Sequence, residues 1–388
     1  MRSRELTIDG VRIADDTDAW VIAEIGHNHQ GSLEHAKELF AEAARCGASA
    51  VKLQKRDNRS LYTREFFNKP YENENSYGPT YGLHREALEF GRGEYEELKA
   101  YAAELGVTFF ATAFDFQSAE LLADLDLPAY KIASGDLTNT PLLRFVAEIG
   151  KPMIVSTGGG TLDDVRRAYE SVAEINPQVA LLQCTAGYPA EWEELDLRVI
   201  ETYRQLFPEA VVGYSGHDNG IAMPIAAYVL GGRIVEKHFT LNRAMKGTDH
   251  RFSLEPVGLR KLVRDLKRTR VALGDGSKLP YPSETDPIKK MGKKIVAART
   301  LPAGHVLRRE DLALKSPADG GLPPYELDAV IGRTLRHPLS EDDAFTFDDL
   351  EELLPGAAGD TGEPGVAQAD RSDALEPAGA PRRADDEL

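Results

Sequence analysis

Short apolar runs and stretches of helical period alternate eight times along the first three quarters of this chain. The apolar runs are nearly continuous, as in parallel strands that are buried on both faces. They fall at residues 20–25, 50–54, 108–113, 129–132, 153–157, 179–184, 211–216 and 234–239. A strand followed by a helix, repeated eight times, predicts a (β/α)8 barrel whose last helix spans residues 256–273.

An open, doubly wound sheet is the alternative fold. It would normally carry a glycine-rich dinucleotide loop after its first strand. Residues 24–31 read EIGHNHQG and contain no such fingerprint, so the barrel is favoured. One connection, residues 55–93, is longer than the others and rich in Asn, Tyr, Pro and Gly.

The pattern changes after residue 288 to short, mostly β runs with turns, at 294–300, 301–307 and 309–312. We therefore predict a barrel domain at residues 1–285 and a small, mostly β domain at 286–353. Residues 354–388 are rich in Ala, Gly, Pro and acids and cannot bury a core, which predicts a disordered acidic tail.

The net charge of −17 argues against nucleic acid or an anionic membrane as the partner, because both require a basic face. No run approaches the roughly 18 apolar residues of a membrane span, and no signal-peptide core is present. Only Cys46 and Cys184 are available for disulfides, so a reducing cytoplasm is expected. A chain this acidic must gather its positive charges locally in order to bind an anion.

Two lysines lie within predicted strands, and a barrel has its active site at the carboxyl ends of its strands. Lys52 and Lys131 are costly to bury unless an anion pairs with them. That anion could be Glu24 or Asp136 of the protein itself. The other interpretation is an anion cage suited to phosphate, in which both lysines act with the hydroxyls of Thr112, Ser134, Ser156 and Ser215.

Two histidines follow consecutive strands, in GYSGH (213–217) and EKHF (236–239). His217 and His238 could hold one divalent cation, although a lone histidine beside a strand is more often packed or hydrogen-bonded. A metal with two protein ligands keeps open positions for polarising a substrate carbonyl. Carboxylates of the same rim are Glu24, Asp136, Glu236 and Asp249. The residues alone thus indicate a metal-assisted aldol-type reaction or a reaction on a phosphoryl substrate.

Six motifs, in order along the predicted strands, resemble the sialic acid (N-acetylneuraminate) synthases. They are IAEIGHNHQG (22–31), KLQK (52–55), YKIASGD (130–136), QCTAGYP (183–189), GYSGH (213–217) and EKHFT (236–240). The resemblance extends over residues 18–353. It implies condensation of phosphoenolpyruvate with N-acetylmannosamine, or with its 6-phosphate, to a nine-carbon 2-keto acid and phosphate.

The same resemblance implies a role for each site residue. His217 and His238 match the ligands of Mn²⁺ or Mg²⁺, and Glu24 matches a catalytic carboxylate beside C1 of the acceptor. The phosphoenolpyruvate site corresponds to Lys52, Thr112, Lys131, Ser134, Ser156 and Ser215. The acceptor-sugar contacts correspond to Gln54, Asp136, Tyr188 and Asp249. Two departures weaken the acceptor assignment: Ala186 stands where many members have Asn or Ser, and Asp136 where Glu is common.

The long connection, with YGLH (81–84) and LEF (88–90), resembles the branch that takes a phosphorylated acceptor. Lys55 and Arg56 follow the second strand and could meet a second phosphate, or could pair with Asp57 or Glu65. Residues 292–353 resemble the antifreeze-like (SAF) domain of these synthases, which implies a domain-swapped homodimer. Bacterial members often have an arginine at the position of Ser316, and this chain lacks it.

Two other functions remain open from the sequence. A legionaminic or pseudaminic acid synthase would use the same chemistry on a different hexosamine. The second is a non-catalytic carbohydrate-binding protein on a barrel scaffold. Such a protein would be expected to lose the charged residues at its strand ends, and this chain retains them.

Overall fold

The computed structural model describes residues 3–351. The chain divides into two compact units, one ending at Gly276 and the other beginning at Ser277. The predicted disordered tail, residues 354–388, lies outside the described residues.

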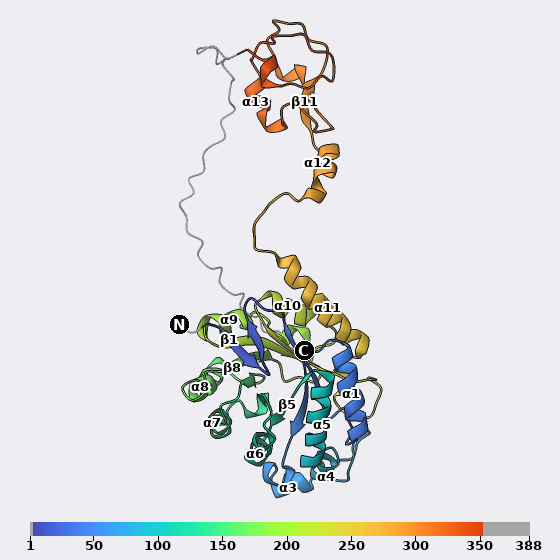
Figure 1. The fold of residues 1–388 in the computed structure, drawn as a ribbon, viewed down its shortest axis with the longest axis vertical. Helices are drawn as coiled ribbons and strands as arrows, with labels where there is room; N and C mark the ends of the chain where they lie inside the picture. The colour runs from blue at the N-terminus through green and yellow to red at the C-terminus, as the bar shows by residue number, and fades with distance from the viewer. Residues whose placement is uncertain (1–2, 352–388) are drawn as a thin grey trace, which may run out of the picture. The chain divides into compact units, whose positions relative to one another are not determined.

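The first unit is a closed barrel of eight parallel strands (Figure 1). In chain order these are β3 (Trp20–Gly26), β4 (Ala50–Lys55), β5 (Thr108–Ala113), β6 (Tyr130–Ile132), β7 (Met153–Ser156), β8 (Val179–Cys184), β9 (Val211–Gly216) and β10 (Ile234–His238). Strand β10 pairs in parallel with both β9 and β3, which closes the barrel. The predicted (β/α)8 fold is confirmed, and the open sheet is excluded.

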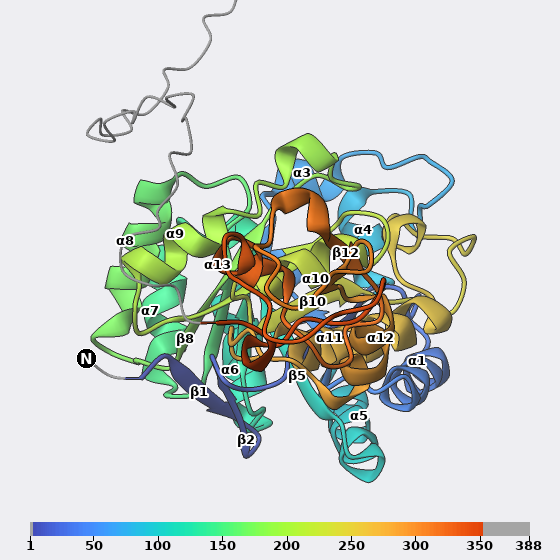
Figure 2. The same ribbon diagram turned by 90° about the horizontal axis from the view of Figure 1, so that it is seen from above.

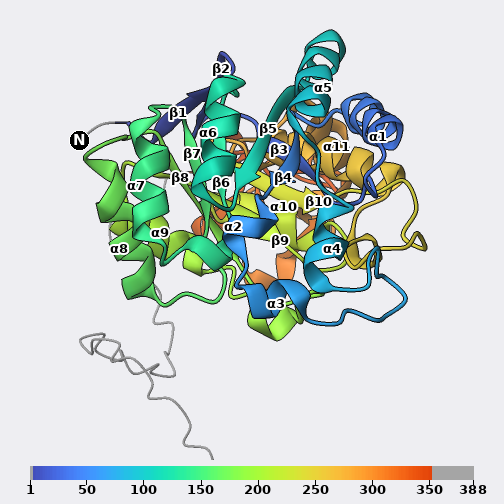
Figure 3. The same ribbon diagram turned by 90° about the horizontal axis from the view of Figure 1, so that it is seen from below.

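A ring of helices surrounds the strands (Figure 3). It consists of α1 (Leu33–Arg45), α5 (Arg92–Leu105), α6 (Phe116–Asp124), α7 (Thr140–Glu148), α8 (Leu162–Ala173), α9 (Val199–Leu206), α10 (Ala222–Val229) and α11 (Pro256–Leu273). Helix α1 shows why these segments are helical. Ser32 caps its first turn by accepting from the backbone N–H of His35, and the apolar stripe Ala36, Leu39, Phe40 and Ala43 is buried in the main core.

A β-hairpin that the strand pattern did not predict precedes the barrel. Its strands β1 (Glu5–Ile8) and β2 (Val11–Ala14) meet at Asp9-Gly10, where both residues have positive φ. Leu6, Ile8 and Ile13 join the apolar cluster that fills the barrel near Trp20. The hairpin, dark blue in Figure 2, lies at the end of the barrel opposite α3 in Figure 1. This end is packed with apolar side chains, so the polar chemistry is confined to the other end.

The long connection is an ordered insert with three short helices, α2 (Asn58–Leu61), α3 (Arg64–Asn68) and α4 (Tyr81–Glu86). Its aromatic side chains pack on one another: Tyr81 contacts the rings of Tyr62, Phe66 and Tyr71. The insert therefore has a small core of its own.

The second unit contains one short antiparallel sheet, β11 (Lys294–Ala297) with β12 (Leu312–Lys315), and the helices α12 (Thr285–Met291) and α13 (Leu327–Val330). A separate apolar core includes Ile295, Leu301, Val330 and Phe345. Residues Arg309–Asp311, predicted as part of a β run, instead form a 3-10 turn. Within residues 3–351, no helix combines the length and apolar character that crossing a membrane requires.

Candidate active site

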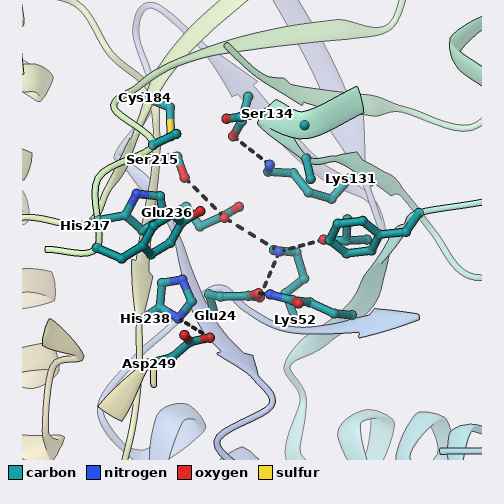
Figure 4. A pocket seen from close by; sticks show the side chains of 18 of the residues that line it. Glu24, Lys52, Lys131, Ser134, Cys184, Ser215, His217, Glu236, His238 and Asp249 are labelled. Carbon is teal, nitrogen blue, oxygen red and sulfur yellow. Dashed lines mark hydrogen bonds and ion pairs between the residues drawn. The ribbon is translucent and has the colours of Figure 1, made fainter. Parts of the chain in front are cut away.

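A cavity of about 490 Å³ opens at the carboxyl ends of the barrel strands, a size suited to small-molecule substrates (Figure 4). Nearly all of the predicted site residues line it: Glu24, Lys52, Gln54, Thr112, Lys131, Ser134, Ser156, Tyr188, Ser215, His217, His238 and Asp249. Asp136 does not. It ends the 3-10 turn Ser134–Asp136, and its Oδ1 accepts a hydrogen bond of 3.0 Å from Asn139 Nδ2.

The two buried lysines have different partners. Lys52 Nζ lies 2.8 Å from Glu24 Oε2 and 2.9 Å from Thr112 Oγ1. For Lys52, the predicted ion pair with Glu24 is therefore present. Lys131 Nζ donates to Ser156 Oγ at 2.6 Å. Among the described residues, no carboxylate lies within 4 Å of the Lys131 ammonium. Of these two lysines, Lys131 is therefore the one more available to an anionic ligand, although its burial lowers the pKa of the ammonium.

Two buried carboxylates share the centre of the cavity. Burial raises the pKa of Glu24, and the nearby Glu236 adds to this effect, against the opposing charge of Lys52. Burial also acts to raise the pKa of Glu236, but Lys131 and Lys52 outweigh it and the pKa is lowered. Opposite shifts in neighbouring acids are typical of sites in which one group holds a proton and the other stays ionised.

Gln54 fixes the orientation of Glu24. Its Nε2 donates to Glu24 Oε1 at 2.7 Å, where β3 ends at Gly26. Gly26 has φ +55°, and a Cβ there would lie only 3.2 Å from Gln54 Nε2. The positive φ and this close approach both favour a glycine at this position.

The two predicted histidines face each other across the cavity, with ring centroids 5.4 Å apart (Figure 4). His217 Nδ1 lies 2.8 Å from the carbonyl oxygen of Thr185, to which it donates, so Nε2 is left for a ligand. His238 Nδ1 is buried without a hydrogen-bond partner, and Asp249 Oδ2 is 3.9 Å away.

Both imidazoles are in the form that binds a metal. Burial lowers the pKa of His217 to about 4 and also lowers the pKa of His238, so both rings are neutral at pH 7. No group of three or more His, Cys, Asp or Glu side chains within residues 3–351 is arranged to hold a metal. His217 and His238 would therefore hold an ion only if water or substrate supplied its remaining ligands.

A buried ion pair behind the cavity positions the His217 segment. Lys237 Nζ lies 2.9 Å from Asp218 Oδ1, which also accepts 2.8 Å from Tyr214 OH. Lys237 and Asp218 are fully buried. A Cβ at Gly216 would come within 2.4 Å of Asp218 Oδ1, so a glycine between Tyr214 and Asp218 permits this contact. The pair ties β10 to the loop that follows β9.

Some residues of the cavity were not singled out from the sequence. Arg85 and Phe114 line it, and so does Cys184, which was considered only as a possible disulfide partner. Arg85 belongs to the short helix α4 of the insert, so no strand-end pattern could point to it. Lys55 pairs with Glu89 at 3.1 Å rather than with Asp57 or Glu65.

A closed (β/α)8 barrel with lysines, paired carboxylates and neutral histidines in one cavity is the architecture of a barrel enzyme. The NeuB family model matches residues 39–278, and a SAF domain model matches residues 294–351. The chain therefore belongs to the NeuB family of sialic acid synthases and carries a SAF domain. The family and the second domain predicted from the sequence are both confirmed.

Named relatives agree with this assignment. N-acetylneuraminate-9-phosphate synthase of Homo sapiens is 39% identical over 335 residues, covering 86% of this chain and 92% of the human protein. N,N'-diacetyllegionaminic acid synthase of Campylobacter jejuni is 33% identical, covering 83% of this chain and 97% of that protein. The crystal structure of N-acetylneuraminic acid synthetase from Leptospira borgpetersenii, in complex with citrate, matches with a TM-score of 0.65 and 31% identity. That match covers 74% of this chain and 95% of the Leptospira chain.

Proposed function

We propose that this protein condenses phosphoenolpyruvate with the 6-phosphate of N-acetylmannosamine to give N-acetylneuraminate 9-phosphate and inorganic phosphate. The observation that carries the proposal is that one cavity holds Lys131, which has no described carboxylate within 4 Å, together with the facing pair His217 and His238. An anion and a carbonyl compound can meet there. The 39% identical human 9-phosphate synthase supports the phosphorylated acceptor.

In this reaction C3 of phosphoenolpyruvate forms a bond to the aldehyde carbon, and the aldehyde oxygen takes up a proton. The oxygen of a water molecule adds at C2, and cleavage of the C2–O bond releases phosphate and leaves a 2-keto group. Lys131 and Ser156 hold the anionic donor. Glu24, whose pKa is raised by burial, exchanges a proton near the acceptor carbon, and Gln54 and Lys52 fix its carboxyl group.

A divalent metal, Mn²⁺ or Mg²⁺, is part of this proposal. Bound to His217 and His238, it would supply Lewis-acid polarisation of the aldehyde. His217→Ala should abolish Mn²⁺ binding measured by electron paramagnetic resonance, as well as divalent-ion activation. The matched control is His35→Ala, a histidine of the outer helix α1 that pairs with Glu38. Full activity of the unaltered protein in excess chelator would exclude the metal.

The acceptor is tested directly. The purified protein is incubated with phosphoenolpyruvate, Mn²⁺ and either N-acetylmannosamine or its 6-phosphate, and phosphate release is measured together with the mass of the product. We expect kcat/KM to be roughly a hundredfold higher for the 6-phosphate, because a second phosphate group would add charge-assisted hydrogen bonds to the protein. Equal or faster reaction of the free sugar would contradict the phosphorylated acceptor. Preference for the hexosamine acceptor of a legionaminic or pseudaminic acid synthase would assign the protein to that activity instead.

A domain-swapped homodimer and a contact of Asp136 with the acceptor stay predictions from the family resemblance, and a cytoplasmic location stays a prediction from the cysteine content. Light scattering coupled to size-exclusion chromatography measures the first. A monomeric mass at micromolar concentration in an active preparation would contradict it.

A further inference from the structure

Besides the lysines of the strands, two arginines of the insert lie at the cavity. Arg56 and Arg85 both line the cavity. They also share one contact behind it: Arg56 Nη1 lies 3.1 Å from His27 Nε2, and Arg85 Nη1 lies 3.0 Å from His27 Nδ1. One neutral imidazole can accept at only one nitrogen, so His27 cannot satisfy both guanidinium groups.

These arginines lack a matching set of carboxylates. Glu89 is 3.9 Å from Arg56 Nη1 and already accepts hydrogen bonds from Lys55 Nζ, at 3.1 Å, and from the backbone N–H of Arg56, at 3.2 Å. Arg85 has no carboxylate within 4 Å among the described residues, and Asp249 acts on it only from farther away. Lys55 and Arg56 thus share the one carboxylate of Glu89. Arg56 is only 7% exposed, and an uncompensated charge at such a site is costly.

The guanidinium groups are held in fixed orientations. Arg56 Nη2 donates to Gln54 Oε1 at 2.6 Å, and its guanidinium lies over the ring of Phe114 at 3.7 Å. Arg85 Nε and Nη2 donate to Tyr81 OH at 3.1 and 3.0 Å. Such rigid forks suit the oxygens of a phosphate group, which they can bind in bidentate fashion.

We propose that Arg56 and Arg85 form the subsite for the phosphate group of the acceptor sugar. Gln54 joins this subsite to the catalytic end of the cavity, because it binds Arg56 through Oε1 and Glu24 through Nε2. When the phosphate group of the acceptor binds the two arginines, its aldehyde end is therefore directed at Glu24 and the histidine pair. This inference rests on the proposed function, and it assigns acceptor specificity to the insert rather than to the strand ends.

The test compares the acceptor preference of variants, measured as the ratio of kcat/KM for N-acetylmannosamine 6-phosphate to kcat/KM for the free sugar. Arg56→Met and Arg85→Met should each lower this ratio at least about tenfold, with the KM for phosphoenolpyruvate unchanged. Tyr81→Phe should lower it less, because the arginine keeps its charge and loses only its support. Arg59→Met is the matched control, since Arg59 belongs to the same insert but is exposed and pairs with Glu86.

The two possible failures are distinguishable. If the unaltered protein prefers the free sugar, the proposed function itself fails. If it prefers the 6-phosphate and the arginine variants keep that ratio, the function stands and the subsite is wrong. Should a methionine variant unfold, Arg85→Lys provides the test, because a lysine retains the charge but not the fork. Inorganic phosphate as a competitor against the 6-phosphate should lose inhibitory strength in the same variants, and unchanged inhibition would also overturn the subsite.

Discussion

At the scale of single residues, two lysines that the sequence presents in the same way differ in their surroundings. Lys52 lies between Glu24, Glu236 and Thr112, so most of its charge is compensated by the protein. Among the described residues, the hydrogen-bond partners of the Lys131 ammonium are one hydroxyl and one carbonyl oxygen. Glu236 offsets part of the cost of burying the Lys131 charge, without contacting its ammonium, and a bound anion would offset more of it. Lys131 should act on the substrate, and Lys52 chiefly on the carboxylates.

Lys131→Met should raise the KM for phosphoenolpyruvate by roughly tenfold to a hundredfold, since it removes a charge-assisted hydrogen bond, and should change the KM for the acceptor little. Steady-state kinetics with each substrate varied in turn measure both constants. Lys151→Met is the control, because Lys151 is an exposed lysine that pairs with Asp126. An equal rise for both substrates would mean that Lys131 is structural.

At the scale of elements, the site residues at the strand ends could be predicted from the sequence, and the position of Arg85 in the insert could not. The eight strands carry a periodic apolar signal, and the ends of parallel strands must meet at one rim, so residues such as Lys131 and His238 could be grouped from the sequence. The hairpin β1–β2 was missed because its strands are only partly buried, so they lack the continuous apolar run of the barrel strands. Arg85 was missed because its position depends on how an irregular insert folds over the rim, which no local pattern encodes.

The insert also braces the loop that carries Asp249. Tyr77 OH and Gln30 Nε2 both donate to the carbonyl oxygen of Lys246 at 2.7 Å, and the backbone N–H of Gly247 donates to Asn75 Oδ1 at 2.9 Å. The Lys246 ammonium lies over the ring of Tyr77. Asp249, two residues further on, is thereby held near His238. The insert thus orders a part of the site that lies far from it in the sequence.

Tyr77→Phe combined with Asn75→Ala should raise the KM for the acceptor about five- to tenfold. Each change removes a hydrogen bond worth on the order of 1 kcal/mol, and the KM for phosphoenolpyruvate should stay the same. Tyr71→Phe is the control, because this tyrosine of the insert packs on Tyr81 and His84 instead of the loop. If the double variant loses thermal stability but keeps its acceptor KM, the brace serves folding alone.

At the scale of the whole molecule, the chain consists of two units with separate cores, and each has its own buried charges. In the second unit Asp311 is fully buried, with Arg299 Nη2 2.6 Å from Oδ1 and His305 Nε2 2.8 Å from Oδ2. The backbone N–H of Arg308 donates to the same carboxylate at 2.9 Å. One side chain thus connects three points of the second unit.

Asp311 makes the stability of the second unit depend on pH. Burial opposes ionisation of this carboxyl, but the hydrogen bonds from His305, Arg308 and Arg299 outweigh it and lower the pKa from 3.8 to about 2. A depressed pKa means that the ionised form stabilises the folded state. This stabilisation is complete above pH 3.8 and is lost as the pH falls towards 2.

Asp311→Asn should therefore speed amide hydrogen exchange in β11 and β12 of the full-length protein at pH 7, while the barrel strands are unaffected. The difference between variant and unaltered protein should shrink as the pH approaches 2. Asp348→Asn, at an exposed position of the same unit, is the control. Faster exchange throughout the barrel, or a difference that persists undiminished at pH 2, would contradict a local electrostatic role for Asp311.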